Sequence, residues 1–274
     1  MNYRPRQPGY EEKGQGYRAW ALPPGHPLAG LLSEIFYLDR WPQVHGAQVV
    51  PDGCDDLLFL LDDGRVRGYF SPSLRESHRF SFAGQGALLG VRFQPGAADN
   101  FLGKPRPVFR GSPVEGAALW RDFGDIEVRL TETGELRRKV EVLTAYLRGK
   151  AQADTERQRL LKFCVSAIVQ AQGTCSVQEL ARRTGYTDRY LRQCFRRGLG
   201  HSPKEFAEII RLQHLLTLLK QRPECSLADL ALCCGFADQS HMNRAARAYL
   251  GHTAGQLRGQ SAWSEGSRPE RQFR

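Results

Sequence analysis

One local pattern occurs twice in the last third of this chain and constrains its fold more than any other feature. Each copy holds a Leu-Ala pair, a glycine and an aromatic residue, at Leu180, Ala181, Gly185 and Tyr186 and again at Leu230, Ala231, Gly235 and Phe236. The glycine can take the positive φ that ends a helix, and Thr187 or Asp238 can cap the helix that follows. Each copy is therefore predicted to be a helix-turn-helix, with first helices over 177–184 and 227–234.

The formal net charge of +10 lies mainly on the part of the chain that holds this duplication. Residues 1–150 carry 20 Lys and Arg against 18 Asp and Glu, whereas residues 151–260 carry 16 against 9. A surface that neutralises phosphates has such an excess of basic side chains. The charge favours a nucleic-acid partner for the carboxyl-terminal half, although a solvated basic face has the same composition.

The sequence gives no sign of a membrane segment, a secretion signal or a metal centre. It has no run of about 18 apolar residues, and residues 2–16 are polar without a hydrophobic core. Its seven cysteines include no C-x-x-C pair, which indicates reduced thiols rather than a disulfide framework or a zinc ribbon. We expect a cytoplasmic protein with no cofactor, no bound metal and no membrane contact.

The amino-terminal half is predicted to be β-rich. Short apolar runs bounded by Gly, Pro and Asp predict strands over 56–61, 67–70, 78–82 and 87–93. Such strands suggest a small barrel or sandwich. Helices are expected next, over 114–123, 125–131 and 135–148. The fold class is therefore α+β, with a β barrel or sandwich and following helices, then an all-α domain of two helix-turn-helix units joined by a long helix.

Composition suggests where the domains begin and end. The stretch 149–154 is small and polar, which is typical of a linker. We expect a disordered tail over 1–16, a β-rich sensing or dimerisation domain with a helical extension over 17–150, a double helix-turn-helix domain over 154–258, and a disordered tail over 259–274.

The segment from Cys175 to Arg258 resembles the DNA-binding domain of the AraC-type family of bacterial transcription regulators. Its densest matches are the runs LGHSPKEF, residues 199–206, and GFADQSH, residues 235–241. The resemblance implies two helix-turn-helix units joined by a long helix, expected here over 204–220. At about 1.5 Å per residue this helix spans roughly 25 Å. Such a spacer suits two recognition helices that are about one turn of DNA, roughly 34 Å, apart.

Two positions depart from the family pattern. Ala246 stands where the family usually has a core Phe, and Ala254 where it usually has Pro. An unfilled space at Ala246 would cost about 3 to 5 kcal/mol of stability. We therefore expect Met242, Tyr249 or Leu250 to fill it, or the second unit to bind DNA more weakly.

The outward residues of the two recognition helices are the expected readers of DNA bases. By helical spacing and by the resemblance, these are Arg189, Arg192 and Gln193 in the first unit and Gln239, Ser240, Asn243 and Arg244 in the second. Arg matches guanine, and Gln or Asn matches adenine, by a pair of hydrogen bonds. Five arginines are expected to hold phosphates, namely Arg182, Arg183, Arg196, Arg197 and Arg247. For any single arginine the alternative is a solvated helix face.

Two segments of the β-rich half, residues 50–57 (VPDGCDDL) and 90–98 (GVRFQPGAA), resemble a domain that accompanies some AraC-type regulators. The family resemblance implies an effector site, a dimer contact or both, without naming a ligand. Helix 135–148 is the candidate dimer contact, against the alternative that it only covers the sheet. Besides double-stranded DNA, the expected partners are a small-molecule effector, a second copy of the chain and RNA polymerase.

Candidate effector contacts in this half are Trp41, Cys54, Tyr69 and Arg92. The aromatic residues can line an apolar pocket, although aromatic residues on alternating strands are more often core. Arg92 is charged within an apolar strand, and it can pair with an acidic ligand or with Asp55 or Asp56.

Cys54 admits three sharper interpretations: a redox sensor, a metal ligand with His45 or His78, or an alkyl acceptor. Each needs a thiolate, and the aspartates that flank Cys54 raise a thiol pKa rather than lower it. We favour the interpretation of Cys54 as a small buried residue.

Three classes of function are open at this point. The leading hypothesis is a sequence-specific transcription regulator that reads two successive major grooves and is controlled through its amino-terminal domain. The alternatives are a thiol sensor or alkyl acceptor that uses Cys54 beside a DNA-binding module, and a non-specific architectural DNA-binding protein. Because no Ser/His/Asp order, phosphate loop or metal-spaced cluster is evident, we expect no enzyme activity and name no catalytic residue.

Overall fold

The computed structural model describes residues 3–11, 16–40, 47–82, 86–102, 113–259 and 270–273 of the 274-residue chain. The strands are β1 (Arg18–Trp20), β2 (Leu32–Leu38), β3 (Ala47–Val49), β4 (Asp56–Asp62), β5 (Arg65–Ser71), β6 (His78–Phe82), β7 (Ala87–Phe93), β8 (Val114–Glu115) and β9 (Glu270–Phe273). The helices of the amino-terminal half are α1 (Pro8–Glu11), the 3-10 turns η1 (Ala98–Asn100) and η3 (Gly116–Ala118), α2 (Phe123–Glu132) and α3 (Leu136–Lys150). Those of the carboxyl-terminal half are α4 (Glu156–Gln170), α5 (Val177–Thr184), α6 (Asp188–Gly198), α7 (Pro203–Gln221), α8 (Leu227–Cys233), α9 (Gln239–Leu250) and α10 (Ala254–Arg258).

Two sheets share a core in the amino-terminal half. The larger sheet is antiparallel and has the order β1-β2-β7-β4-β5-β8, and the smaller has the order β3-β6-β9. Successive side chains of a strand point to opposite faces. Leu58 and Leu60 of β4 accordingly lie with Phe80 of the smaller sheet, whereas Leu57 and Phe59 lie in the core on the other face. The predicted β-rich half followed by helices is confirmed, and burial on both faces explains the continuous apolar run of β4.

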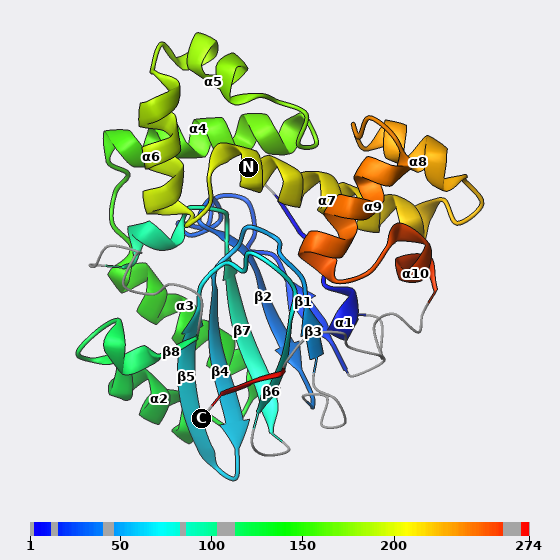
Figure 1. Cartoon of the computed structure of the whole chain (residues 1–274). Coiled ribbons are helices and arrows are strands. Elements are labelled where there is room, and N and C mark those ends of the chain that lie inside the picture. Colours follow the sequence, from blue (N-terminus) through cyan, green and yellow to red (C-terminus); the bar gives the residue numbers. More distant parts are fainter. Residues whose placement is uncertain are drawn as a thin grey trace.

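Helices α2 and α3 cover the outer face of the larger sheet (Figure 1). Phe123 of α2 stacks on Phe59 with 5.8 Å between ring centroids, and Leu143 of α3 is fully buried in the same core. Lys139 is buried too, and its ammonium group donates a hydrogen bond to the carbonyl oxygen of Leu130. Helix α3 therefore covers the sheet, and a dimer contact through its outer face stays a prediction.

The prediction of a helix over 114–123 is wrong. Strand β8 and the turn η3 take its place, and β8 pairs with the end of β5. Gly116 lies so close to the ring of Phe123 that a Cβ atom there would overlap it. Pairing with the sheet and this close approach outweigh the local helical preference.

The expected disordered tails also differ from the structure. Residues 3–11, called the amino-terminal arm from here on, include α1 and the buried side chains of Tyr3 and Gln7. Within the segment 259–274, residues 270–273 form β9, which runs parallel to β6. The arm is held by contacts with residues distant in sequence, so its polar composition gave no sign of them.

The carboxyl-terminal helices begin and end as their local sequence predicts. Gly185 follows α5 with a φ of 74°, and Gly235 follows α8 with a φ of 72°. The side chains of Thr187 and Asp238 accept hydrogen bonds from backbone amides at the starts of α6 and α9. The two helix-turn-helix units, α5–α6 and α8–α9, thus lie at opposite ends of α7 (Figure 1).

Two hydrophobic cores of the carboxyl-terminal half include residues of the amino-terminal half. One core joins α7 to the second unit and takes in Val50. The other joins α7 to α4, α5 and α6 and takes in Tyr3 and Cys54. The two halves of the described chain are therefore packed together along α7.

Hydrogen bonds tie two parts of the amino-terminal half to the same helix. These parts are the arm and the described residues of 16–115, which hold strands β1 to β8 and are called the β domain from here on. Gln213 in α7 accepts from the Arg6 backbone amide at 2.7 Å and donates to the Pro51 carbonyl oxygen at 2.9 Å. Gln7 donates to the Asp52 carboxylate at 2.8 Å. The arm is consequently held between α7 and the loop that precedes β4.

The β domain also contacts each end of the helical half. Near the first unit, the Ser73 hydroxyl lies 2.8 Å from Nε2 of His201. In the second unit, the Tyr249 carbonyl oxygen accepts from the Ser77 backbone amide at 2.7 Å. The β domain therefore contacts both helix-turn-helix halves as well as the helix between them.

A buried ionic cluster lies under this interface. Arg92 of β7 is fully buried, with its nitrogens 2.9 Å from Glu34, 3.0 Å from Asp56 and 3.6 Å from Asp52. Burial raises the pKa of Asp56 to about 7, against the lowering effect of the Arg92 charge. Burial likewise raises the pKa of Asp52. The sequence alternative in which Arg92 pairs with Asp56 is confirmed.

Substitution of Gly53 tests the contact between the β domain and α7. Gly53 has a φ of 77°, and a Cβ there would overlap the Phe206 ring, whereas Gly64 has a φ of 73° and open space around it. We expect Gly53→Ala to lower the free energy of unfolding by about 2 to 4 kcal/mol and Gly64→Ala by about 1 kcal/mol, because only the first adds overlap to backbone strain. Urea unfolding followed by circular dichroism measures both. Equal losses would show that the Phe206 contact contributes nothing.

The titration of Asp56 predicts a pH dependence of stability. Folded Asp56 keeps its proton up to a pKa of about 7, and the unfolded group loses it near its ordinary value of 3.8. Between these values the folded state binds more protons, so the free energy of unfolding falls as pH rises. Acidification from about pH 7.5 to about pH 5 should therefore stabilise the wild type relative to Asp56→Asn, which cannot titrate. Parallel curves of unfolding free energy against pH would contradict the raised pKa.

Candidate nucleic-acid interface

Helix α6 exposes a basic face. Leu191, Cys194 and Phe195 are fully buried and hold the helix in its unit. Its exposed outward residues are Arg189, Arg192, Gln193, Arg196 and Arg197. Residues three and four apart lie on one face of a helix. The three predicted base readers of the first unit therefore lie next to one another.

Helix α9 presents a comparable face, with one exception. Exposed residues here are Gln239, Ser240, Arg244 and Arg247. Asn243 is half-buried, and its Oδ1 accepts a hydrogen bond from the Ala254 backbone amide at 3.0 Å. Sequence reasoning missed this link, which leaves the NH2 group and the second lone pair of Oδ1 of Asn243 for a DNA base.

The space around Ala246 is closed by its neighbours. Ala246 is fully buried in one core with Met242 and Leu250, and Tyr249 packs against that core. The Tyr249 hydroxyl donates to Glu208 of α7 at 2.6 Å. These contacts agree with the expectation that neighbours compensate for the Phe found in the family.

A cavity of about 340 Å³ lies along α7 between the two units. Its lining includes the charged residues Arg192, Lys204, Glu208 and Arg211, together with His241. The guanidinium group of Arg211 is fixed by donation to the Gly173 carbonyl oxygen at 2.8 Å. Lys204 and Arg211 were missed as candidate contacts, and their seven-residue spacing on a predicted helix was the signal that could have found them.

The β domain packs on the opposite side of α7 from this cavity. Residues advance by about 100° around a helix, so positions two apart lie on opposite sides. Phe206 and Gln213 face the β domain, whereas Lys204 and Arg211, two positions before each, line the cavity. The β domain can therefore hold α7 without covering this side.

The predicted phosphate contacts are all exposed, and they are Arg182, Arg183, Arg196, Arg197 and Arg247. The guanidinium group of Arg183 lies 5.3 Å from the ring centroid of Phe163 on α4. A phosphate contact by Arg183 would therefore compete with this cation–π contact.

The structure does not bring the three described candidate effector contacts into one pocket. Trp41 lies outside the described residues. Tyr69 belongs to the core between the sheets, Cys54 to the core shared with α7, and Arg92 to the ionic cluster. Tyr69 thus fits the alternative interpretation as a core residue.

Cys54 is a small buried residue. Burial raises the pKa of its thiol well above the ordinary value, and the Asp52 charge adds to the effect. His45, one of its two suggested metal partners, lies outside the described residues. Among those that are described, no group of three or more His, Cys, Asp or Glu side chains is arranged to hold a metal ion.

Comparison with known proteins agrees with this geometry. Residues 180–260 match the family model described as a helix-turn-helix domain, and they contain the second part of α5, all of α6, the whole joining helix α7, and the second unit. This match identifies residues 180–260 as a helix-turn-helix domain of the AraC type. Residues 21–115 match a second model, described as a domain of unknown function. This second match covers most of the β domain.

Among solved structures, the chain is similar to ToxT from Vibrio cholerae. Apo ToxT K231A is 10% identical with a TM-score of 0.41, and the alignment covers 81% of this chain and 96% of that one. A wild-type ToxT bound to an unsaturated fatty acid is also 10% identical, with a TM-score of 0.40 and coverage of 82% and 93%. Similarity this low supports no inference about a ligand. No curated protein matches the chain.

Within the described residues, no helix combines the length and the apolar character that a bilayer crossing requires.

Proposed function

We propose that this regulator reads specific DNA by placing α6 and α9 in successive major grooves, while its amino-terminal domain sets how the two helices are held. The observation that carries the proposal is that the β domain covers one side of α7 and leaves the side between the two units uncovered. The β domain packs against one side of α7, and a basic cavity between the two units lies on the other side.

The spacing of the two units fits one face of the DNA duplex. Helix α7 has 19 residues, which corresponds to a length of about 27 Å. Recognition helices that enter successive major grooves are about 34 Å apart. A rigid helix of this length is therefore a suitable spacer, and Lys204 and Arg211 lie where the intervening phosphates would pass.

We assign the reading of DNA bases to the exposed faces of the two recognition helices. In the proposal Arg189, Arg192 and Gln193 read one element of the site. Gln239, Ser240, Arg244 and the NH2 group of Asn243 read the other. The five exposed arginines named above hold phosphates, which position the protein without reading bases.

The amino-terminal domain is assigned a controlling role. Because it contacts both helix-turn-helix halves, a change in its packing alters their relative placement, and an effector would act by shifting an existing equilibrium. Dimerisation through the outer face of α3 and contact with RNA polymerase belong to the same proposal. A role for Cys54 as an alkyl acceptor or thiol sensor is disfavoured, since its thiol is buried.

Selection of bound duplexes from a random DNA pool tests the proposal, at near-physiological salt and with the full chain. We expect two short motifs about one helical turn apart. Arg192→Ala should degrade one motif and Arg244→Ala the other, each by about 1 to 3 kcal/mol at one base position. Arg197→Ala is the matched control on α6, and it should weaken binding to all sequences alike.

Binding without any enriched motif would overturn the proposal in favour of an architectural DNA-binding protein. Equal losses on every sequence from Arg192→Ala and Arg197→Ala would overturn the assignment of reading and phosphate roles.

A further inference from the structure

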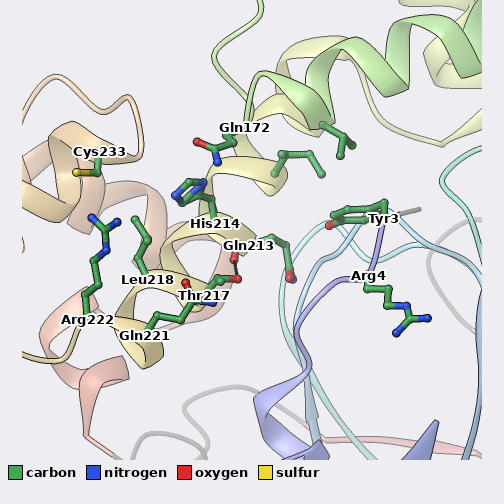
Figure 2. Close-up of a pocket in the computed structure, with 12 residues that line it drawn as sticks. Tyr3, Arg4, Gln172, Gln213, His214, Thr217, Leu218, Gln221, Arg222 and Cys233 are labelled. Atoms are coloured by element: carbon green, nitrogen blue, oxygen red, sulfur yellow. Dashed lines mark hydrogen bonds between the residues drawn. The ribbon is translucent and has the colours of Figure 1, made fainter. Parts of the chain in front are cut away.

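A second cavity lies on another side of α7 from the candidate DNA surface, next to the contact that Gln213 makes with the β domain. Its volume is about 610 Å³. Figure 2 shows that its walls come from three parts of the chain, with Tyr3 and Arg4 on the arm, Gln172 after α4, and Cys233 on α8. Helix α7 forms the floor. The cavity therefore contacts the β domain's arm and both helix-turn-helix halves at once.

The chemistry of the lining favours an anion. Two arginines, Arg4 and Arg222, stand at the cavity, and none of the described residues that line it is Asp or Glu. Neither guanidinium group has an ion pair within the described part of the chain. Two unneutralised cations on one concave surface attract a negatively charged ligand.

The lining also offers hydrogen-bonding groups that the fold does not use. Gln172, His214 and Gln221 line the cavity without a side-chain hydrogen bond to any described residue. By contrast, the side chain of Gln213 already accepts a hydrogen bond from the Arg6 amide and donates one to the Pro51 carbonyl oxygen. Gln213 is therefore a structural part of the cavity wall. Burial lowers the pKa of His214, which keeps its ring neutral at physiological pH and able both to donate and to accept. These groups suit a ligand with hydroxyl or carbonyl oxygens.

Gln172 reaches the cavity from an unusual backbone conformation. Its φ is 50°, in the left-handed region that non-glycine residues rarely occupy. The turn after α4 thereby directs the side chain toward His214 of α7, as Figure 2 shows. Strain of this kind at a cavity wall is typical of ligand sites.

We propose that this cavity is a binding site for a small polar organic anion, a hydroxylated carboxylate or a phosphate ester. Its size lies within the range of roughly 300 to 1,000 Å³ found for small-molecule sites. Arg4 and Arg222, which lie at opposite sides of the lining in Figure 2, attract the charge, and Gln172, His214 and Gln221 bind the polar body. Regulation of DNA binding by this ligand rests on the proposed function, whereas binding itself does not.

Cys233 supplies a local reporter for occupancy. It lines the cavity and is exposed, whereas Cys225 is half-buried and does not line it. Alkylation by iodoacetamide, followed peptide by peptide with mass spectrometry, reports both thiols in one sample. A ligand at about ten times its Kd should lower the rate of alkylation of Cys233 about tenfold and leave the rate for Cys225 unchanged.

The probes form matched pairs at constant ionic strength. Gluconate is compared with sorbitol, a neutral open-chain sugar alcohol, and ribose 5-phosphate with the neutral sugar ribose, so each pair differs in charge at the same number of carbon atoms. We expect at least one anion to protect Cys233 and both neutral compounds to fail. Protection by gluconate alone or by ribose 5-phosphate alone identifies the carboxylate or the phosphate ester as the preferred form.

Variants connect protection to the cavity. Arg4→Gln combined with Arg222→Gln should abolish protection without changing the thermal unfolding temperature, because both side chains are exposed. Arg137→Gln, on the exposed side of α3, is the matched control and should retain it. The proposal is overturned if no probe slows Cys233, if the neutral compounds protect equally, or if the double variant is still protected.

The same assay separates this proposal from the proposed function. Protection measured without DNA tests the site alone. Adding the selected duplex then tests coupling, since a ligand that changes DNA affinity must have its own affinity changed by the same factor. Protection that is identical with and without DNA would confirm the site and refute its regulatory role.

Discussion

The burial of α7 on more than one side is the constraint on which the rest of the structure depends. An isolated helix of this length is marginal in water and gains most of its stability from packing. Here Phe206 and Leu216 lie in cores that also hold residues of the first and the second unit, respectively. Val50 of the β domain completes the core of the second unit, and Cys54 with Tyr3 of the arm completes that of the first. The two units are consequently held at a defined distance by contacts that neither unit makes alone.

The loop before β4 provides the contact between the β domain and that helix. Gly53 permits close approach to the Phe206 ring, and Asp52 joins the arm to the buried Arg92. Removing one partner from a buried ionic cluster leaves uncompensated charge, at a cost of about 3 to 5 kcal/mol. The same residues that suggested a reactive thiol or an effector contact are thus explained by packing between the two halves of the chain.

The helical half was predictable because its signals are local. Gly185 and Gly235 end helices, Thr187 and Asp238 begin them, and apolar residues recur at helical spacing, so a few neighbouring residues decide each boundary. Strands β4, β6 and β7 also followed from short apolar runs. The base readers were largely exposed as expected, because outward positions on a helix follow from its periodicity.

What the sequence did not predict depends on distant partners. The burial of the arm and the engagement of Asn243 with α10 arise from contacts that no local pattern announces. Strand β8 replaced an expected helix for the same reason, since its pairing partner β5 lies far back in the chain. The cavity beside α7 is formed by residues from the arm, α4, α7 and α8, and only the assembled fold brings them together.

Native-state hydrogen exchange tests most directly whether α7 and the β domain form one cooperative structure. The slowest amides of α7 should exchange with the same free energy of opening as those of β4 and β7, because α7 cannot lose its cover while the β domain stays in place. Exchange of α7 at a clearly lower free energy, with β4 and β7 still protected, would contradict the account and show two halves that open independently.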